Sequence, residues 1–578
     1  MENGGFFDSE NESTSDFDGF TNDDLPDETF DLDERYNSSD VDLSSDSDDL
    51  PLSRLRNGHN RENGNEEIEP ETPNRTTSWS PVLTDIQVDA FVQPVGAVNI
   101  LGNDAKEIDF FEQIFPDESY VKIAQETNRY AQSRIEQNGD DPKWFATNAD
   151  EIRAFIGFNI LMGIVIAPTQ DMYFSMDAFF RPTGMSDRIT RDRFDKLCQY
   201  FHVCDISTNP DRGQPGHDKL AHVRPFLEAI RVQCRTQYSP HCETSIDEAM
   251  VAYTGRLSIK QYLPMKPTKR GIKIWARADP HNGFLNDFQV YTGKVNNVVE
   301  TGLGERVVKD LTRDIWGKNH RVYCDNYFTS VPLFQELLDN KTYACGTVRT
   351  NRKYLPASVT QAKLKHQGEM VIEQKEGSMI AVAWHDKRTV NILSTLSNPL
   401  ERTTVKRKKK DGTQVDVPCP QAVKSYTAYM NGVDRADQLR SSYSVSRRAA
   451  KWWKYLFWFL IDISIINAFI MMKESANHIM TSKTGRKKER CQLEFRQNLT
   501  KQLVGTYWHK RKRESIQKKA TDGLLHWPVV LGKKRTCKQC TLQGVRREPT
   551  SGCEQCNVNL CVGCFKPYHK AKFPALFQ

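Results

Sequence analysis

The sequence predicts a multidomain protein with a mixed α/β core between mainly helical segments. Its 578 residues exceed the length that a single hydrophobic core usually organises. Short β-prone runs follow amphipathic helical segments in the middle of the chain. Six of the 14 cysteines fall within residues 537–564. We therefore expect a separate cysteine-rich domain after the α/β core.

The beginning of the chain has a composition of its own. Residues 1–50 contain 18 acidic residues and one arginine, although the whole chain carries a formal charge of +4. The rest is thus strongly basic, as is typical of proteins that bind polyanions. Residues 1–95 show little apolar periodicity and are predicted to be a disordered acidic tail. One hypothesis is that this tail competes with a polyanionic partner for the basic body.

The ordered part is predicted to begin with helices and to continue as an α/β region. Helical spacing of apolar residues runs over 108–115, 120–135, 150–165, 191–201 and 224–238. The β-prone runs are 245–253, 272–278, 284–291, 321–324 and 343–348, with a helix expected over 331–338 after the capping residue Ser330. Further short strands are expected at 370–373, 380–384 and 390–394, followed by a hairpin that turns at Asp411–Gly412.

One apolar segment, Trp452–Met472, allows two interpretations, a membrane span or a buried helix. It contains Lys454, Asp462 and Asn467. A central aspartate alone costs about 2.5–3.5 kcal/mol on insertion scales, which favours a helix buried in the protein. The start of the chain lacks a signal-peptide pattern, and the scattered cysteines do not resemble a disulfide framework. We expect an intracellular, reducing compartment.

Four aspartates lie where a metal-dependent nuclease would need them. Asp247 lies on a short strand, and Asp325 ends an apolar strand, where ligand sites of α/β sheets usually lie. Asp434 and Asp437 are spaced i and i+3 at the start of a helix. Two Mg²⁺ ions about 3.5–4 Å apart can activate the nucleophile and relieve phosphate charge, and Mg²⁺ prefers carboxylate oxygens. Taken alone, each aspartate could equally be a cap or turn residue.

The linked motifs around these aspartates resemble those of the piggyBac transposases. In chain order they read SDRITRDRFDKL, SIDEAMVAYTGR, KPTKRGIK, YCDNYFTS, GTVRTNRK and NGVDRADQ, and the resemblance extends from about residue 105 to the C-terminus. It implies that Asp247, Asp325 and Asp434 are catalytic and hold Mg²⁺, and that Asp437 is a further acidic residue needed for activity. No catalytic position is replaced in this chain.

The resemblance also implies a domain organisation. An RNase H-like catalytic core is interrupted by a β-rich insertion and flanked by a helical dimerisation and DNA-binding domain, with a small zinc-binding cross-brace domain at the end. The expected boundaries are 1–95 for the disordered tail, 96–242 and 444–522 for the helical domain, 243–351 and 421–443 for the catalytic domain, 352–420 for the insertion, and 523–578 for the zinc-binding domain.

The implied function is that of a magnesium-dependent nuclear DNA transposase. Such an enzyme acts as a homodimer or larger assembly on terminal inverted repeats, excises the element through hairpin ends and integrates it at TTAA. The alternative is a domesticated DNA-binding protein that keeps the fold but does not transpose.

Basic residues follow the first two aspartates and could neutralise a DNA backbone. A solvated charged face is the competing interpretation. The resemblance also implies that Trp452 stacks on a displaced base, whereas Trp453 and Trp458 are expected in the core. The basic candidates are Lys266, Lys269, Arg270, Lys273, Arg349, Arg352 and Lys353. The runs 406–410, 510–513 and 533–535 could serve nuclear import or phosphate contact, and the sequence does not separate these uses.

The cysteine-rich end predicts two structural zinc sites. Each Cys-x2-Cys pair is half of a tetrahedral site, and so little apolar sequence hardly folds without metal. The resemblance makes His526, in a His-Trp-Pro phrase, the candidate for the missing eighth ligand. In a cross-brace, one zinc is held by Cys537, Cys540, Cys561 and Cys564, and the other by Cys553, Cys556, His569 and His526.

The resemblance implies that this zinc-binding domain reads the ends of the transposon. Arg546 and Arg547, which lie between the ligands, could touch phosphate. A cross-brace also resembles ubiquitin-ligase and chromatin-reading modules, so a protein-binding role is the alternative.

Overall fold

The computed structural model describes residues 79–573, apart from residues 176, 178, 180–183, 212, 265, 294–299, 410–411, 446–448, 482–484 and 510–525. The predicted acidic tail up to residue 78, the turn residue Asp411 and the basic run 510–513 lie outside the described residues.

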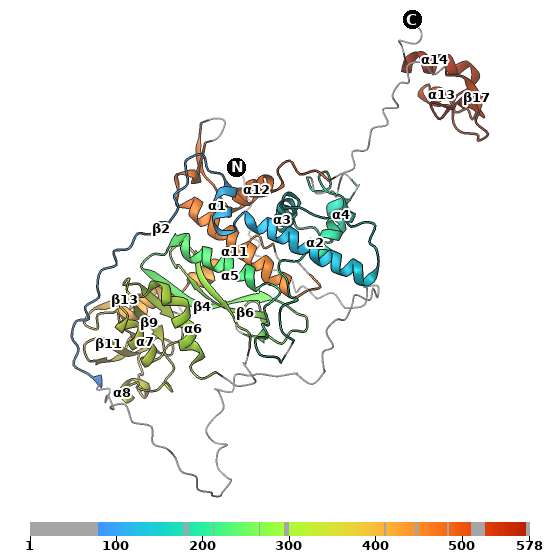
Figure 1. The fold of residues 1–578 in the computed structure, drawn as a ribbon. Helices are drawn as coiled ribbons and strands as arrows, with labels where there is room; N and C mark the ends of the chain where they lie inside the picture. The colour runs from blue at the N-terminus through green and yellow to red at the C-terminus, as the bar shows by residue number, and fades with distance from the viewer. Residues whose placement is uncertain are drawn as a thin grey trace, which may run out of the picture. The chain divides into compact units, whose positions relative to one another are not determined.

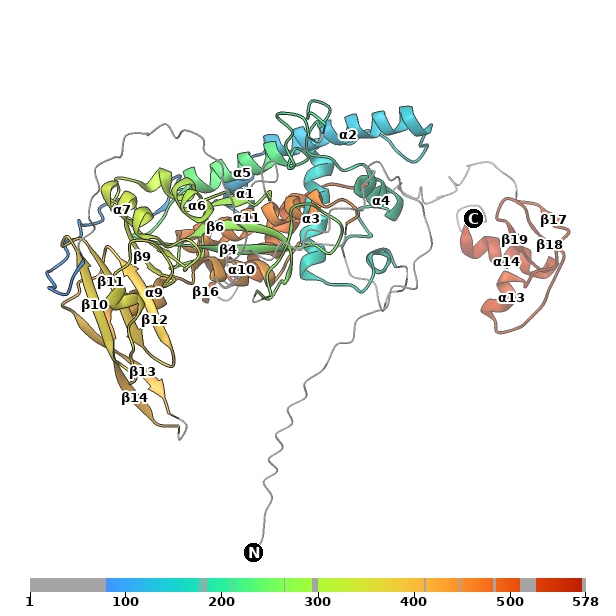
Figure 2. The ribbon, with the colours of Figure 1, turned by 90° about the horizontal axis from the view of Figure 1, so that it is seen from below.

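A ten-stranded mixed sheet lies at the centre of the α/β region (Figures 1 and 2). Strands β4, β8 and β9 are parallel neighbours, and the other pairs are antiparallel. Each β-prone run expected between residues 245 and 394 is a strand. In spatial order the strands are β1 (Trp79–Ser80), β10 (Met370–Lys375), β11 (Met379–His385), β12 (Thr389–Ser394), β9 (Tyr343–Thr347), β8 (Arg321–Cys324), β4 (Glu243–Ala252), β6 (Arg270–Ala278) and β5 (Lys260–Tyr262), with β7 (Leu285–Val290) also paired to β6.

Both faces of the sheet are buried because its side chains alternate between two cores. On β4, Ile246 belongs to a core that includes α6 (Leu303–Thr312) and α7 (Val331–Asp339). Ala249 and Val251 belong to the larger core on the other face, which includes the long helices. The Ser330 side chain accepts a hydrogen bond from Leu333 N and caps α7, as the sequence predicts.

Helices from before and after the sheet pack together. Helix α1 contacts α11, and α12 contacts α3, although these partners are more than 300 residues apart in the chain. Asn148 caps the start of α3, because its side chain accepts a hydrogen bond from Glu151 N. The helices are α1 (Glu107–Ile114), α2 (Glu118–Asn138), α3 (Ala149–Ile164), α4 (Arg191–Tyr200), α5 (Arg224–Thr236), α11 (Trp453–Lys473) and α12 (Gln492–Val504), with 3-10 turns at Gln170–Phe174, Arg313–Ile315 and Ala476–His478.

Within the described residues, α11 is the one helix long and apolar enough to cross a membrane, and 94% of its most apolar window is buried inside the protein. Its polar side chains have internal partners. The Asp462 carboxylate pairs with Arg496 of α12 at 3.3 Å, and the Asn467 side chain binds the backbone N–H and C=O of Leu285. These contacts support the prediction of a buried helix.

The segment expected to be a β-rich insertion extends the central sheet. Strand β12 pairs with β9, so β10–β12 continue the sheet outward from β8 and β9. The expected hairpin is present as β13 (Arg402–Lys408) and β14 (Gln414–Pro420). The neighbouring helices are α8 (Ala357–Thr360), α9 (Gln421–Tyr429) and α10 (Gly432–Ser441).

The prediction of disorder up to residue 95 is wrong for residues 79–95. Trp79 Nε1 donates to Tyr354 O, β1 pairs with β10, and Ile86 is 7% exposed in the core beside β11 and β12. Few apolar residues anchor this segment, and their partners are distant in sequence. Local composition therefore gives no sign of it.

The remaining described elements are small. The cysteine-rich end forms a three-stranded sheet and two short helices. These are β17 (Pro528–Val530), α13 (Lys538–Leu542), β18 (Ser551–Cys553), β19 (Val558–Asn559) and α14 (Val562–Lys572). Two further strand pairs join β2 (Gly96–Ala97) to β3 (Tyr238–Ser239), and β15 (Ile479–Thr481) to β16 (Lys487–Glu489).

Candidate active site and metal-binding residues

Asp247 and Asp325 are brought together by the register of two parallel strands. Ile246 of β4 is paired with Cys324 of β8, so the two aspartates are the next residues along neighbouring chains. Adjacent strands lie about 4.8 Å apart. The two carboxylates therefore lie side by side in the sheet, at the level where β8 and β9 end.

Asp325 lies in a partly buried turn between β8 and α7. Its Oδ1 accepts a hydrogen bond from Tyr327 N at 2.9 Å. Burial, to which the Asp247 carboxylate adds, nevertheless raises the pKa of Asp325 to about 6. The charge of Asp247 is thus felt at Asp325, as expected for carboxylates that face a common space.

Lys266 provides a cation at this place. Its Nζ donates to Asp247 Oδ2 at 2.9 Å. Burial lowers the pKa of Lys266, but the Asp247 carboxylate and the charges of Glu248 and Asp434 together hold that pKa above its usual value. Lys266 therefore senses carboxylates from both β4 and α10.

Helix α10 brings Asp434 to the site because Gly432 allows close contact with the sheet. A Cβ at Gly432 would lie 2.9 Å from Ala278 O, closer than real Cβ contacts come. The helix packs against β4 and β6 at this point. Asp434 follows two residues later, in the first turn of the helix.

Asp437 has a different immediate partner from Asp434. Its Oδ1 accepts from Arg440 Nη2 at 3.1 Å, and the same nitrogen donates to Met250 O of β4 at 3.2 Å. Burial raises the pKa of Asp437 even though Arg440 opposes it. Asp437 thus lies in a contact that ties α10 to the end of β4.

In the described part of the chain, the three aspartates do not form a set of ligand atoms that all lie within 4.8 Å. Asp247 instead comes from the middle of β4, Asp325 directly follows β8, and Asp434 lies in the first turn of α10, with Lys266 bound to Asp247. Their role as metal ligands therefore stays a prediction.

The basic candidates divide into groups. Arg349 Nε donates to Asn326 Oδ1 at 3.0 Å, and Arg352 Nη2 donates to Tyr327 O at 2.6 Å, so both hold the turn that follows Asp325. The side chains of Lys269, Arg270 and Lys353 are exposed. These residues lie within or just before β6, or just after β9.

Lys273 does not join this group. It is 7% exposed and pairs with Glu248 at 2.8 Å. On β6 it shares a face with Trp275, whereas Ile272, Ile274 and Ala276 belong to the core on the Asp247 face. In this conformation the Lys273 ammonium is paired inside the protein, and the expected DNA contact at Lys273 stays a prediction.

The tryptophans at the start of α11 differ in exposure. Trp452 is partly buried, with its ring edge-on to that of His222 at 6.1 Å. Trp453 is 1% exposed and Trp458 is 5% exposed, both in the main core, as the sequence predicts. Of the three, Trp452 keeps the largest accessible surface.

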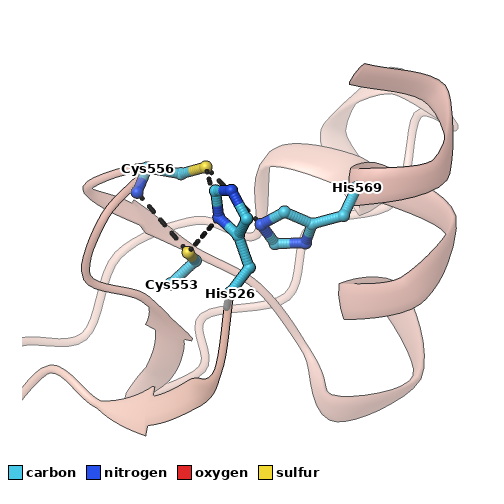
Figure 3. A group of neighbouring side chains, drawn as sticks. All are labelled: His526, Cys553, Cys556 and His569. Carbon is cyan, nitrogen blue, oxygen red and sulfur yellow. Dashed lines mark hydrogen bonds between the residues drawn. The ribbon is translucent and has the colours of Figure 1, made fainter. Parts of the chain in front are cut away.

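The cysteine-rich end gathers its ligands in the two predicted groups. Cys537, Cys540, Cys561 and Cys564 form one set with all ligand atoms within 4.8 Å, and His526, Cys553, Cys556 and His569 form the other. Figure 3 shows the second set, in which His526 Nδ1 lies 3.4 Å from Cys553 Sγ and His569 Nε2 lies 3.5 Å from Cys556 Sγ.

The second set is oriented for metal binding. His569 Nδ1 lies 2.7 Å from Phe565 O, which leaves Nε2 directed to the other ligands. Both sets supply four soft or imidazole ligands, the donors that zinc prefers. Arg546 is exposed and paired with Glu548, and Arg547 is exposed as well.

Two contacts around the candidate aspartates were not predicted from the sequence. Lys266 was expected to touch DNA, and its pairing with Asp247 across 19 residues has no local sequence signal. Asn326, directly after Asp325, was not singled out either, but it binds Arg349. Its adjacency to a candidate aspartate in a turn was the available clue.

Comparison with known proteins places these features in a family. Residues 106–469 match the family model described as Transposase IS4. The chain is 26% identical to the human PiggyBac transposable element-derived protein 5 over 456 residues, covering 76% of this chain and 83% of that protein. It is 28% identical to the human PiggyBac transposable element-derived protein 3 over 557 residues, covering 91% and 88%.

A solved structure is similar over most of the fold. It is a cryo-EM structure of a piggyBac transposase synaptic complex with hairpin DNA, with a TM-score of 0.61 and 26% sequence identity. The similarity covers 82% of this chain and 100% of that one.

Proposed function

Because this chain belongs to the family described as Transposase IS4, and within it to the piggyBac transposases, we propose that it is a DNA transposase that cuts and rejoins DNA at Asp247, Asp325 and Asp434. The observation that carries the proposal is the pairing of β4 with β8, which sets Asp247 beside Asp325 at the edge where α10 supplies Asp434. Asp437 supports α10 through Arg440.

The donor set fits two Mg²⁺ ions. All three side chains are hard oxygen ligands, and the charge of Asp247 helps to raise the pKa of Asp325, a repulsion that bound cations would relieve. When bound, the ions would supply an activated water or 3′-hydroxyl and neutralise charge on the phosphate. Lys266 shares the Asp247 carboxylate and would exchange that contact for a DNA phosphate.

The surrounding residues would bind and position DNA. Exposed Lys269, Arg270 and Lys353 would neutralise backbone charge near the cut. Arg349 and Arg352 would keep the Asp325 turn in place. Trp452, the accessible tryptophan of its group, would stack on an unpaired base.

The proposed reaction is excision through hairpin ends and integration at TTAA. The protein would work in the nucleus as a homodimer or larger assembly, with a catalytic domain of RNase H type over residues 243–351 and 421–443. The similar solved structure is a synaptic complex with hairpin DNA, which supports this course. Terminal inverted repeats of the element would be the double-stranded DNA partner.

The C-terminal domain would hold two structural zinc ions. Each set offers four protein ligands, which leaves no open position for catalysis. With zinc bound, the domain would present Arg546 and Arg547 to the phosphates of the element's ends.

An excision assay tests the proposed active site. We expect the wild-type chain to excise a marked element and Asp325→Asn to fall to background, because one carboxylate oxygen and its negative charge are lost. Asp339→Asn, at an exposed residue at the end of α7, is the matched control and should keep wild-type activity. Equal excision by wild type and Asp325→Asn would remove the aspartate site from the mechanism.

A second function is favoured by the names of the relatives. Two human proteins similar to this chain are named as transposable element-derived. A domesticated protein would bind element-end DNA specifically. In that case wild type, Asp325→Asn and Asp339→Asn would all give no excision.

A further inference from the structure

A basic surface lies at the outer part of the sheet, away from the candidate aspartates. It is formed by the loop before β10, the β11–β12 turn and the β13–β14 hairpin, and we call it the basic corner. Its members are Lys365, Lys387, Arg388, Lys406, Arg407, Lys408 and Lys409, of which all but Arg407 are exposed.

The three segments of the basic corner are held together. Arg407 Nε lies 3.1 Å from both carboxylate oxygens of Asp386 in the β11–β12 turn. Trp384 Nε1 donates to Pro418 O of β14 at 2.8 Å. Gly368 N donates to His385 O at 2.8 Å, which joins the loop before β10 to the same turn. The basic side chains therefore lie on a fixed surface.

The charge of the basic corner is only partly compensated. Its acidic neighbours are Glu369, Asp386 and Asp416. Glu369 accepts from the backbone N–H groups of Lys365 and His366, and Asp386 is bound by Arg407 and Gln367. Asp416 is opposite Lys406 in the hairpin ladder. Among the described residues, seven basic groups thus face three carboxylates, an excess suited to a polyanion.

The backbone of the basic run decides between its two expected uses. Lys406, Arg407 and Lys408 are each paired with a residue of β14 in a continuous antiparallel ladder. An import signal must be read as a free extended peptide, whereas a ladder strand offers only its side chains. Burial of Val417 and Cys419 on β14 anchors the hairpin further. The conformation favours phosphate contact.

The basic corner lies at the same end of the parallel strands as Asp325, the end where β8 and β9 finish. Thr347 at the end of β9 pairs with Ile392, so the start of β12 extends past the carboxyl ends of β8 and β9. The β11–β12 turn joins the second and third strands out from β8, or about 10–15 Å at about 4.8 Å per strand. That distance equals about three to four base pairs at about 3.4 Å each. Figure 2 shows the β13–β14 hairpin continuing beyond this end.

We propose that the basic corner binds the phosphate backbone of double-stranded DNA, beginning about three to four base pairs from the bond cut at Asp247 and Asp325. The proposal rests on the proposed function. Exposed Lys353, near the end of β9, lies at the same end and extends the basic path toward the corner. The contact is independent of sequence because it reads phosphates only.

The test uses the full chain with two triple variants of equal charge change. Lys406→Gln, Lys408→Gln and Lys409→Gln remove charge from the corner. Lys318→Gln, Lys341→Gln and Lys424→Gln are the control, since these exposed lysines lie near the amino ends of β8 and β9 or on α9. Affinity for an element-end duplex is measured against salt, with a long duplex and one ending two base pairs beyond the cut. Nuclear accumulation of each variant is scored in cells.

We expect the corner variant to bind the long duplex about tenfold or more weakly at 100 mM salt, and its salt slope to fall by about 2–3, as for three lost phosphate contacts. The short duplex should bind the corner variant and the control equally. Both variants should still enter the nucleus.

Two other results would overturn the proposal. Loss of nuclear entry with unchanged DNA binding would make the run an import signal. Equal weakening by the corner and control variants would reduce the surface to a general charge effect.

If wild type itself does not bind the duplex, the proposed function falls together with the corner. If wild type binds and only the corner effect is missing, the corner falls alone.

Discussion

The aspartate site and the cysteine-rich end are two candidate metal regions with opposite construction. Asp247, Asp325 and Asp434 are spread over nearly 190 residues and are positioned by a ten-stranded sheet with two buried faces. The cysteine-rich end gathers eight ligands within residues 526–569, and its core consists of little more than Cys537, Cys540 and Leu560. The first region has a fold without metal, whereas the second has almost nothing else to hold it.

Because of this difference, metal binding should have a different effect on the folding of each region. In the sheet, packing already holds the strands, so metal binding would relieve repulsion between carboxylates without having to fold the region. In the cysteine-rich end, the free energy of zinc binding would be the free energy of folding. Metal removal should therefore affect the two regions very differently.

The largest expected effect is the loss of the C-terminal fold on zinc removal. Structural zinc contributes about 10–16 kcal/mol in small zinc domains, and few apolar contacts would replace it here. A strong chelator should abolish hydrogen-exchange protection over residues 528–572 of the full chain, while β4 and β8 keep theirs. The intact sample should contain two zinc ions per chain by elemental analysis.

Partial results would sharpen that comparison. Cys540→Ser should remove one zinc and lower protection throughout the domain. Retained protection over residues 528–572 after complete zinc loss would contradict the view that this region lacks a core of its own.

A smaller effect is expected from pH at the aspartate site. The pKa of Asp325 is about 6 in the folded, metal-free protein, against about 3.9 when unfolded. A raised carboxyl pKa means that the folded state binds the proton more tightly. Its stability contribution is therefore present below about pH 4 and is lost as pH rises toward 6 and above.

The Asp325→Asn substitution should remove this loss of folding stability at high pH, because asparagine does not ionise. The two-unit difference corresponds to about 2–3 kcal/mol at most. Without Mg²⁺, we expect the variant to be more stable than wild type at pH 7.5 and equal to it near pH 4, by urea unfolding followed with tryptophan fluorescence. Mg²⁺ at pH 7.5 should stabilise wild type and leave Asp325→Asn unchanged. A wild type that is more stable at pH 7.5 than the variant without Mg²⁺ would contradict a raised pKa of Asp325, whether from burial or from the Asp247 charge.

Local patterns in the sequence predict most individual elements. The alternating runs give β4 and β6, the apolar run before Asp325 gives β8, and Ser330 marks the start of α7. The spacing of the cysteine pairs, together with the resemblance that singles out His526, predicts both ligand sets, because those ligands are close along the chain.

What the sequence does not predict depends on contacts between distant residues. The burial of Lys273 was not predicted, because a basic residue beside a motif says nothing about which side of β6 meets which core, although its alternation with Ile272 and Ile274 carried that information. The order of residues 79–95 and the pairing of Lys266 with Asp247 come from partners brought in by the fold. The sequence likewise does not reveal that β12 pairs with β9, which places the basic corner at the same end of the strands as Asp325.

The central claim is that Asp247, Asp325 and Asp434 together hold divalent cations, and Mn²⁺ binding tests it most directly. Mn²⁺ has the oxygen preference of Mg²⁺ and can be counted by electron paramagnetic resonance on zinc-loaded full-length protein. Wild type and Asp339→Asn should bind two Mn²⁺ ions, and Asp325→Asn should lose at least one or bind it more than tenfold more weakly. Equal Mn²⁺ number and affinity in all three proteins would contradict a metal site at these aspartates.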